Sequence, residues 1–227
     1  MDTFIHQETV KRLQREAVSF LTHKELRIRG KSVAPKEIEV YYYEDNGDFK
    51  DTSVHRNILQ RNNPNRFYIH RRGLMDTDKY KGGNRAGIDF VISDDKSIYY
   101  SYLIRSAVID GQLKIGPNNV LKYLTEVTKC SYEEIESSPV EMVSLNSEGD
   151  VLFSKRINLG KNVGEFEGYE LRAVLCDSLF RNNKYPQKES MIVGFLLKRA
   201  ILGMPKEEVL KYAQENLGYV PSCLKSL

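Results

Sequence analysis

The stretch KEIEVYYYED, residues 36–45, carries the clearest strand signal in the chain and directly follows Pro35. Polar and apolar side chains alternate along it from Glu37 to Tyr43. One face takes Ile38, Val40 and Tyr42, and the other takes Glu37, Glu39, Tyr41 and Tyr43. Because successive side chains of a strand point to opposite faces, the pattern predicts a strand with both of its first two carboxylates on one face.

Helices and further strands flank this stretch on both sides. Apolar residues recur at helical spacing over 6–22, and Gly116–Pro117 marks the start of a helix that continues to Val127. Further strands are predicted near residues 26–28, 88–93, 97–108, 139–144, 150–157 and 168–175. Two more helices follow, at 190–202 and from Pro205 to Gly218. This order predicts an α+β fold: one N-terminal helix, a mainly antiparallel sheet and C-terminal helices.

The 227 residues suffice for one large domain or for a domain with an addition. Near the C-terminal end of the chain, the sequence pattern changes from strands to helices. This change predicts an α+β domain over residues 1–177 and a helical extension over 178–227 that packs on it. The last two helices resemble a helix-turn-helix in spacing, but a simple packing pair is the favoured interpretation. Residues 44–86 are rich in Asn, Asp, Gly and Arg and predict a long irregular segment, which is usually functional or disordered.

The near-neutral total charge of +3 hides an uneven distribution. Residues 56–85 hold eight basic side chains against two acidic ones, a net of +6, whereas residues 126–150 hold seven acids against one lysine, a net of −6. A basic patch is the electrostatic signature of phosphate binding. The alternative is a solvated loop whose arginines pair with the acidic segment.

The sequence lacks the motifs and apolar segments by which several classes of protein are usually identified. No run of 18 apolar residues exists, so a transmembrane helix is not expected. The first 18 residues are amphipathic without an apolar signal core, and the three cysteines form no CxxC pair, so we expect an intracellular, cytoplasmic protein without a metal site. The motifs of P-loop, zinc-protease and serine-hydrolase enzymes are also missing.

A series of short motifs remains in a fixed order along the chain. They are EIEVY at 37–41, DTSVH at 51–55, NPNRFYIHRRG at 63–73, GIDFVIS at 87–93, YLIRSAV at 102–108, IGPNNVLKYL at 115–124, SKRINLG at 154–160 and YELRAVL at 169–175. In this order and at similar spacing, the set resembles the alkyladenine (3-methyladenine) DNA glycosylase family. The resemblance covers roughly residues 10–175 and implies that family's curved antiparallel sheet.

The resemblance also implies an activity and residues that carry it. Glu39 matches the glutamate that activates the attacking water, and Arg105 matches the arginine that holds water and backbone near the scissile bond. Tyr41 and His55 match the side chains on either side of the base pocket. Such an enzyme hydrolyses the N-glycosidic bond of a damaged purine flipped out of double-stranded DNA, without metal or cofactor.

The basic stretch is then expected to bind phosphates around the flipped nucleotide. The candidate backbone contacts are Arg66, Arg71, Arg72, Lys81 and Arg85. After Gly73 the chain departs from the family pattern, because LMDTDKYKGGNRAG lacks the family's aromatic series that supplies a second stacking ring and a duplex plug. Tyr68 and Tyr80 are the candidate substitutes.

Two other functions stay open at this point. One is a nucleic-acid-binding protein that keeps the scaffold without the chemistry, and the other is a protein that binds or hydrolyses free nucleosides. Individually, Glu39 also suits a solvent-facing strand position, since glutamate is mostly exposed. Arg105 fits this simpler interpretation least, because a buried arginine needs a partner, and Glu39 is the first candidate.

Overall fold

The computed structural model describes residues 2–73, 79–159 and 164–227 and shows an α+β fold with a curled antiparallel sheet. Its helices are α1 (Asp2–His23), α2 (Ile58–Asn62), α3 (Pro117–Thr128), α4 (Tyr132–Ser137), α5 (Ser178–Asn182), α6 (Lys188–Ile201), α7 (Lys206–Leu217) and α8 (Ser222–Lys225), with short 3₁₀ helices η1 (Gly83–Arg85) and η2 (Gly164–Glu167). Its strands are β1 (Lys24–Ile28), β2 (Lys31–Glu44), β3 (Phe67–Ile69), β4 (Ile88–Val91), β5 (Ile98–Ile109), β6 (Gln112–Ile115), β7 (Glu141–Ser144), β8 (Asp150–Ser154) and β9 (Arg172–Cys176).

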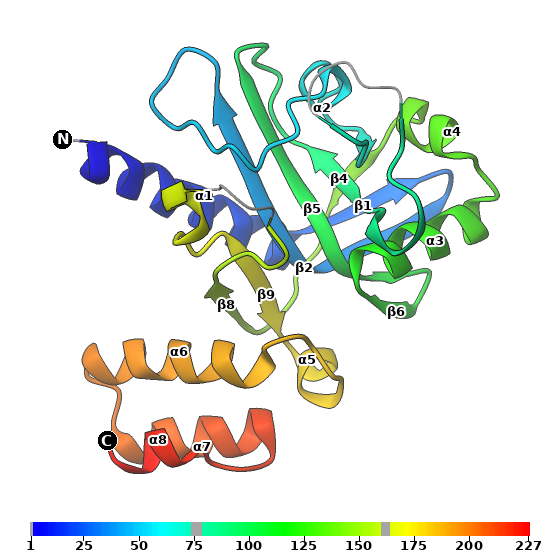
Figure 1. The fold of residues 1–227 in the computed structure, drawn as a ribbon. Helices are drawn as coiled ribbons and strands as arrows, with labels where there is room; N and C mark the ends of the chain where they lie inside the picture. Colours follow the sequence, from blue (N-terminus) through cyan, green and yellow to red (C-terminus); the bar gives the residue numbers. More distant parts are fainter. Residues whose placement is uncertain (1, 74–78, 160–163) are drawn as a thin grey trace.

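Two long strands, β2 and β5, lie side by side at the centre of the sheet (Figure 1). The strand order around them is β3-β4-β5-β2-β1-β7, while β9 also pairs with β2, β8 pairs with β9 and β6 pairs with β5. Over Glu37–Glu39, β2 therefore has a partner on each edge, β5 on one and β9 on the other. Because residues 37–39 lie on a central strand of a curled sheet with a neighbour on each edge, they have little access to solvent.

A bulge interrupts β2 at its proline. The register between β2 and β5 shifts between Pro35 and Glu37 and again before Ile38. Proline has no amide hydrogen for the ladder, so inside a sheet it is confined to positions such as bulges and edges. The sequence analysis placed the strand after Pro35, but the structure continues it through the bulge, back to Lys31.

Helix α1 covers one face of the sheet, and that face holds the main core. Side chains of even number from β2, such as Ile38 and Val40, join Leu13 and Ala17 of α1 in one buried cluster. Phe20 of α1 packs on rings from the central strands, with ring centroids 4.7 Å from Tyr102 and 5.8 Å from Phe90. The odd-numbered side chains of β2 consequently face the other way, as the alternation predicts.

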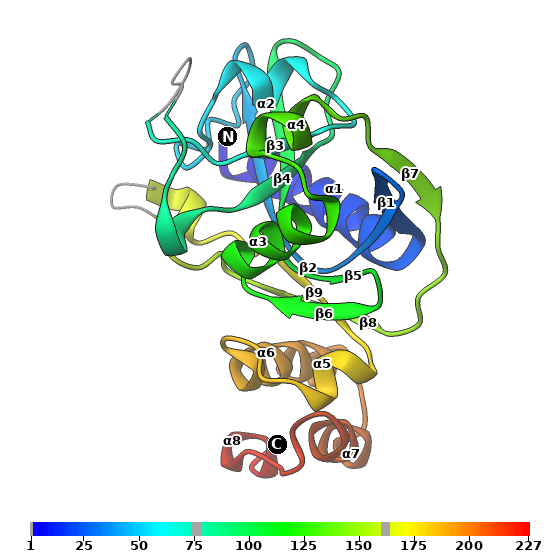
Figure 2. The same ribbon diagram turned by 90° about the vertical axis from the view of Figure 1, so that its right-hand side faces the viewer.

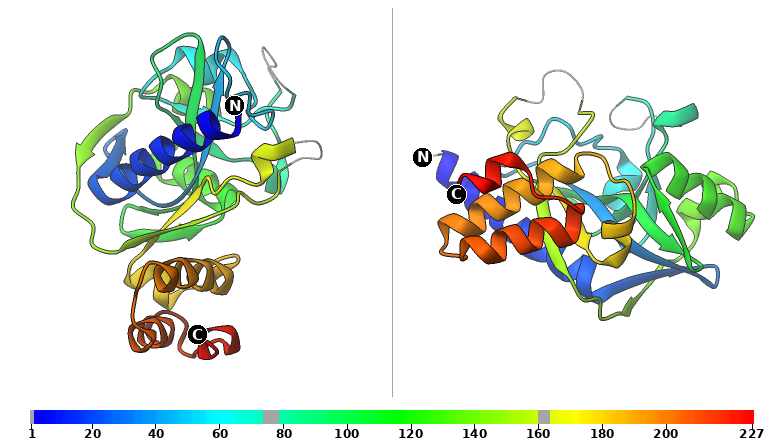
Figure 3. Two further views of the ribbon diagram at one scale, coloured as in Figure 1. Left: turned by 90° about the vertical axis from the view of Figure 1, so that its left-hand side faces the viewer. Right: turned by 90° about the horizontal axis from the view of Figure 1, so that it is seen from below.

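The C-terminal helices form a layer of their own beneath the sheet (Figures 1 and 2). Helices α6 and α7 lie side by side (Figure 3), and their buried residues contact the outer strands β8 and β9. The shared cluster contains Leu152, Val174, Cys176, Met191, Ile192, Leu196, Val209 and Ala213. This arrangement is the packing pair favoured by the sequence analysis, while the division into separate domains at residue 177 stays a prediction.

Most predicted elements are confirmed; β6, α5 and α8 were not predicted, and three further differences have local causes. The irregular segment 44–86 contains α2 and β3, which are too short to give a periodic signal. Helix α4 escaped prediction although Ser131 and Glu134 form a complete capping box at its start. The strand expected from residue 168 begins only at Arg172, because η2 and the turn after it occupy the preceding residues.

Within the described ranges, none of the helices combines the length and apolar character needed to cross a bilayer.

Candidate functional site

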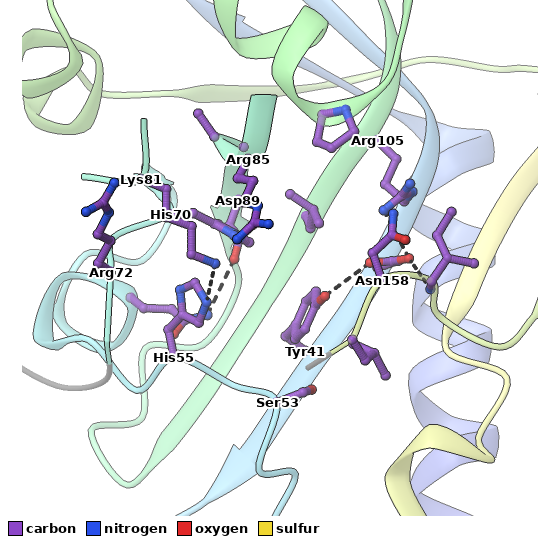
Figure 4. Close-up of a pocket in the computed structure, with 18 of the residues that line it drawn as sticks. Tyr41, Ser53, His55, His70, Arg72, Lys81, Arg85, Asp89, Arg105 and Asn158 are labelled. Carbon is purple, nitrogen blue, oxygen red and sulfur yellow. Dashed lines mark hydrogen bonds and ion pairs between the residues drawn. The ribbon is translucent and has the colours of Figure 1, made fainter. Parts of the chain in front are cut away.

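The odd-numbered face of β2 and β5 forms the floor of a cavity of about 880 Å³. Its walls come from β4, from the loop before α2, from His70 and Arg72, from residues 81–82 and 85–87, and from the loop at 157–159. Glu39, Tyr41, His55 and Arg105 all line it. The cavity thus brings together the four side chains that the family resemblance singled out, of which Figure 4 labels Tyr41, His55 and Arg105.

Glu39 is completely buried, yet its carboxylate lines the cavity. Its Oε1 accepts a hydrogen bond from the amide of Ile157 at 2.9 Å and forms an ion pair with Arg105 Nη1 at 3.2 Å. Its Oε2 accepts one from the Tyr41 hydroxyl at 3.1 Å. A buried carboxylate is tolerated only with such partners, so the solvent-facing interpretation of Glu39 is wrong.

Arg105 belongs to a chain of alternating charges behind Glu39. Its Nε lies 3.1 Å from Glu37 Oε1, and the same oxygen lies 2.7 Å from Arg172 Nε. Burial disfavours the Arg105 cation, but the charges of Glu39 and Glu37 outweigh it, so its pKa is raised. The expected pairing of Arg105 with Glu39 is confirmed. We call Glu37, Glu39, Arg105 and Arg172 the carboxylate end of the cavity.

Tyr41 lies in the middle of the cavity floor (Figure 4). Burial, and then the charge of Glu39, raise the pKa of its phenol well above the ordinary value, so the hydroxyl keeps its proton and donates to Glu39. The guanidinium of Arg156, fully buried in an ion pair with Asp51, lies 4.9 Å from the centre of the ring. The face in contact with Arg156 is covered, which fixes the orientation of the ring.

His55 and Lys81 form a close pair at the opposite side of the cavity. Lys81 Nζ lies 3.1 Å from His55 Nε2, and His55 Nδ1 lies 3.4 Å from the Tyr68 hydroxyl. Burial, the nearby His70 and the Lys81 charge lower the pKa of His55 to about 2, so its ring is neutral. Burial also lowers the pKa of Lys81, although the charge of Asp89 opposes this effect.

His70 and Asp89 complete this side of the cavity. His70 Nε2 lies 2.6 Å from Asp89 Oδ1, and the His70 ring lies 4.6 Å from the His55 ring between centroids. Asp89 is buried and also accepts from Ser101. We call His55, His70, Lys81 and Asp89 the imidazole end.

The five arginines and lysines proposed for phosphate contact divide into two groups. Arg72, Lys81 and Arg85 line the cavity, and the two arginines among them are exposed. Arg71 is buried and paired with Glu136, and the Arg66 guanidinium donates to the carbonyl of Ser137. These last two arginines are bound by the acidic segment, as the alternative for the basic stretch predicted, so they do not form part of the site.

The aromatic substitutes considered for the second stacking ring do not line the cavity. Tyr68 is buried in the sheet, and Tyr80 bonds to Glu136 and packs on Tyr132. The expected position of the family's aromatic series overlaps residues 74–78, which lie outside the described residues. Among the residues that the structure does describe, Tyr41 and the two histidines are the cavity's aromatic rings.

The sequence analysis missed several members of the site. Three of them had a weak signal in the sequence. Glu37 lies on the same strand face as Glu39, and His70 lies two residues after Tyr68, so their side chains share a face. Asp89 is a charged residue within the otherwise apolar strand IDFV. Arg156 and Arg172 were part of quoted motifs but received no role. Over the described part of the chain, no group of three or more metal-ligating side chains is placed to hold a metal ion.

Neither the comparison with protein-family models nor the comparison with curated proteins gives a match for this chain. The likeness to alkyladenine DNA glycosylases therefore depends on the ordered motifs and is carried forward only as a proposal.

Proposed function

We propose that the cavity binds a damaged purine nucleotide flipped out of double-stranded DNA and that Glu39 directs water against its sugar, which hydrolyses the N-glycosidic bond. One observation carries the proposal. Residues from four separate segments, Glu39 and Tyr41 on β2, His55 on a loop, Arg105 on β5 and Ile157 on a second loop, meet at one buried carboxylate and its cavity.

The hydrogen bonds of Glu39 leave room for one more donor. A carboxylate offers about four lone-pair sites, two on each oxygen. Oε1 accepts a hydrogen bond from Ile157 and is paired with the Arg105 charge, whereas Oε2 accepts only from Tyr41 among the described residues. A water bound at the second Oε2 site is aligned by a carboxylate whose own position is fixed by two hydrogen bonds and an ion pair.

The hydrolysis proceeds with a simple balance of atoms. The water oxygen forms a bond to C1′ while the bond from C1′ to the base nitrogen breaks, and its electron pair goes to the base. One water proton passes to Glu39, and the other stays on the new hydroxyl. A positioned general base of this kind contributes about 10²–10⁴-fold to the rate.

Tyr41 and His55 suit the binding of an extrahelical base. Flipping costs a few kcal/mol, least for damaged or mispaired bases, and each aromatic contact with a base returns about 1–3 kcal/mol. His55 is neutral, so it accepts the Lys81 hydrogen bond at Nε2 and presents an uncharged ring. The exposed guanidinium groups of Arg72 and Arg85 are placed at the cavity to bind the flanking phosphates.

The test is excision from labelled duplexes that carry hypoxanthine, ethenoadenine or 7-methylguanine, with alkali to cleave abasic sites. We expect product from the wild type and a loss of at least about 100-fold in single-turnover rate for Glu39→Gln, with nearly unchanged DNA affinity. Glu44→Gln is the matched control, because Glu44 ends the same strand and bonds to Tyr42 and the amide of Phe49 outside the cavity. Equal rates for the wild type and Glu39→Gln would remove Glu39 from the chemistry.

A second candidate is nucleic-acid binding without catalysis. The two hydrogen bonds and the ion pair of Glu39 favour it, because a carboxylate held this firmly also has a purely structural use. It predicts binding that weakens steeply with salt and no abasic product from any duplex. Hydrolysis of free nucleosides without DNA binding would instead assign the cavity to small molecules.

A further inference from the structure

We infer that Glu136 of α4 is a positioning residue of the cavity, which holds three of its basic side chains in place to receive the nucleotide. This inference rests on the proposed function. It concerns a residue outside the motifs that carry the family resemblance, since those motifs leave residues 125–153 uncovered. Glu136 is not among the residues that line the cavity, so its effect passes through the side chains that it contacts.

Three of the cavity's basic side chains lie on one face of a short antiparallel ribbon. We define the ribbon as residues 69–72 and 79–81. Backbone hydrogen bonds join its two arms on either side of a bridge between Arg71 and Tyr80. Because side chains alternate along each arm, the neighbours of these two residues point to the opposite face. The neighbours that line the cavity are His70, Arg72 and Lys81 (Figure 4).

Glu136 contacts the face of the ribbon that points away from the cavity. Its Oε2 forms an ion pair with Arg71 Nη2 and accepts a hydrogen bond from the Tyr80 hydroxyl at 2.9 Å. Arg71 also donates to that hydroxyl at 3.0 Å, and its guanidinium lies 4.0 Å from the centre of the Tyr80 ring. Burial and the hydrogen bond to Glu136 raise the pKa of Tyr80 to about 12, so the phenol keeps its proton. One carboxylate oxygen therefore holds both arms of the ribbon.

The second carboxylate oxygen of Glu136 fixes the ribbon to the sheet. Strand β3 lies at one end of the strand order, and α4 lies against it (Figure 2). The amide of His70 donates to the carbonyl of Gly87, so the amide of Ile69, one residue earlier, points to the other edge. There it donates to Glu136 Oε1 at 2.8 Å. Glu136 is only 6% exposed, and changing a buried charge with such partners has a far larger effect than changing a surface ion pair.

The position of the ribbon should affect binding rather than the chemical step. Its cavity face supplies part of the imidazole end and of the rim, whereas Glu39 lies on β2 and is held by Tyr41, Arg105 and Ile157. When the ribbon leaves its place, the fraction of molecules competent to bind falls, and the apparent dissociation constant rises by the inverse of that fraction. A substrate that does bind still meets an unchanged Glu39. Weaker binding at an almost unchanged maximal rate is therefore the expected signature of losing Glu136.

The test is single-turnover excision of hypoxanthine from a duplex at increasing protein concentration, which separates the half-saturating concentration from the maximal rate. We expect Glu136→Gln to raise the half-saturating concentration at least about tenfold and to change the maximal rate less than about threefold. Adding Arg71→Met to this variant should restore most of the binding. It removes the buried cation that Glu136→Gln leaves with one counter-charge fewer.

Tyr80→Phe provides a milder variant in case Glu136→Gln does not fold. It keeps the ring beside the Arg71 guanidinium and removes only the hydroxyl that donates to Glu136. We expect the half-saturating concentration to rise at least about twofold, because one hydrogen bond to a buried carboxylate is lost.

Glu134→Ala is the matched control on the same helix. The Glu134 carboxylate accepts a hydrogen bond from the amide of Ser131 at 2.7 Å in the capping box, so this variant weakens the start of α4 while Glu136 keeps its carboxylate. We expect less than a twofold change in binding. A rise equal to that of Glu136→Gln would assign the effect to the helix as a whole and overturn the role of Glu136.

The remaining contrary outcomes have separate meanings. Unchanged binding in both Glu136→Gln and Tyr80→Phe, or a fall in the maximal rate alone, would overturn the inference and leave the glycosylase proposal intact. If Arg71 instead binds a phosphate, Arg71→Met alone would lower the slope of log affinity against log salt by about 1, and the double variant would bind no better than Glu136→Gln. Excision of no base by the wild type would overturn the proposed function, and the inference with it.

Discussion

The two ends of the cavity are built from charges of different kinds. The carboxylate end holds two glutamates and two arginines in the middle of the sheet, and these four residues are nearly inaccessible to solvent. The imidazole end holds two histidines, a lysine and an aspartate, and three of these four reach the cavity from segments outside the strands or at their ends. The charges of the carboxylate end thus lie on strands, whereas the two histidines and the lysine of the imidazole end lie on loops or just beyond the end of a strand.

This difference suggests a division of work. Arginine keeps its charge across the physiological pH range, and Arg105 is ion-paired with Glu37 and Glu39, so the carboxylate end holds Glu39 in a defined position. Histidine and lysine change protonation when their surroundings change, so the imidazole end can respond to a ligand or to pH. The first end therefore governs stability and the alignment of Glu39, and the second governs the response to the base.

The largest effect is expected from Glu37→Gln. The variant leaves Arg105 and Arg172 buried with one counter-charge fewer, and breaking a buried ion pair in this way costs about 3–5 kcal/mol. Urea unfolding would measure the loss. Glu170→Gln is the control, because Glu170 pairs with Lys198 at the surface and such pairs contribute about 0–1 kcal/mol. Similar losses for the two variants would contradict the assigned importance of the buried network.

A smaller effect should reveal that the C-terminal helices support the carboxylate end. Arg172 donates to Gln187 Oε1 at 3.1 Å and to the carbonyl of Pro186 at 2.8 Å, both just before α6. Gln187→Met removes one acceptor of a buried cation, which costs about 1.5–3 kcal/mol. We also expect a lower excision rate with unchanged DNA affinity, because Arg172 positions Glu37 and Arg105 behind Glu39.

The control for this variant is Tyr219→Phe, which removes a hydrogen bond from the turn after α7 to Glu189 of α6, whereas the hydrogen bonds of Arg172 go to Glu37, Pro186 and Gln187. Excision that is slowed equally by both variants would show that general loosening of the helices is responsible.

The imidazole end should make the stability of the protein depend on pH. The pKa of His55 falls from 6.5 to about 2 in the folded protein, so below pH 6.5 the unfolded chain binds a proton that the native protein does not. Stability then decreases as pH falls, by about 1.4 kcal/mol per pH unit for one proton. Urea unfolding between pH 6 and pH 4 should give a shallower pH dependence for His55→Gln than for the wild type. Parallel curves would mean that His55 binds its proton equally in both states.

The sequence could predict the carboxylate end far better than the imidazole end. Alternation in EIEVY placed Glu39 and Tyr41 on one face, and the apolar surroundings of Arg105 required a partner such as Glu39. The pairing of His70 with Asp89 joins the end of β3 to β4, and the pairing of His55 with Lys81 joins two irregular segments. No local sequence pattern encodes either contact. Arg71 illustrates the same limit: its charge suggested phosphate binding, but its ion pair with Glu136 depends on a fold-level contact.

The smallest structural effect is expected at the exposed rim, where Arg85 lines the cavity. Arg85→Ala should change the free energy of unfolding by less than about 0.5 kcal/mol, as is usual for surface positions. If Arg85 binds a phosphate, the slope of log affinity for DNA against log salt should decrease by about 1. Arg15→Ala is the matched control, since Arg15 is an exposed residue of α1, the helix that covers the other face of the sheet. An unchanged slope for Arg85→Ala, or an equal change for Arg15→Ala, would contradict a phosphate contact of Arg85 at the rim of the cavity.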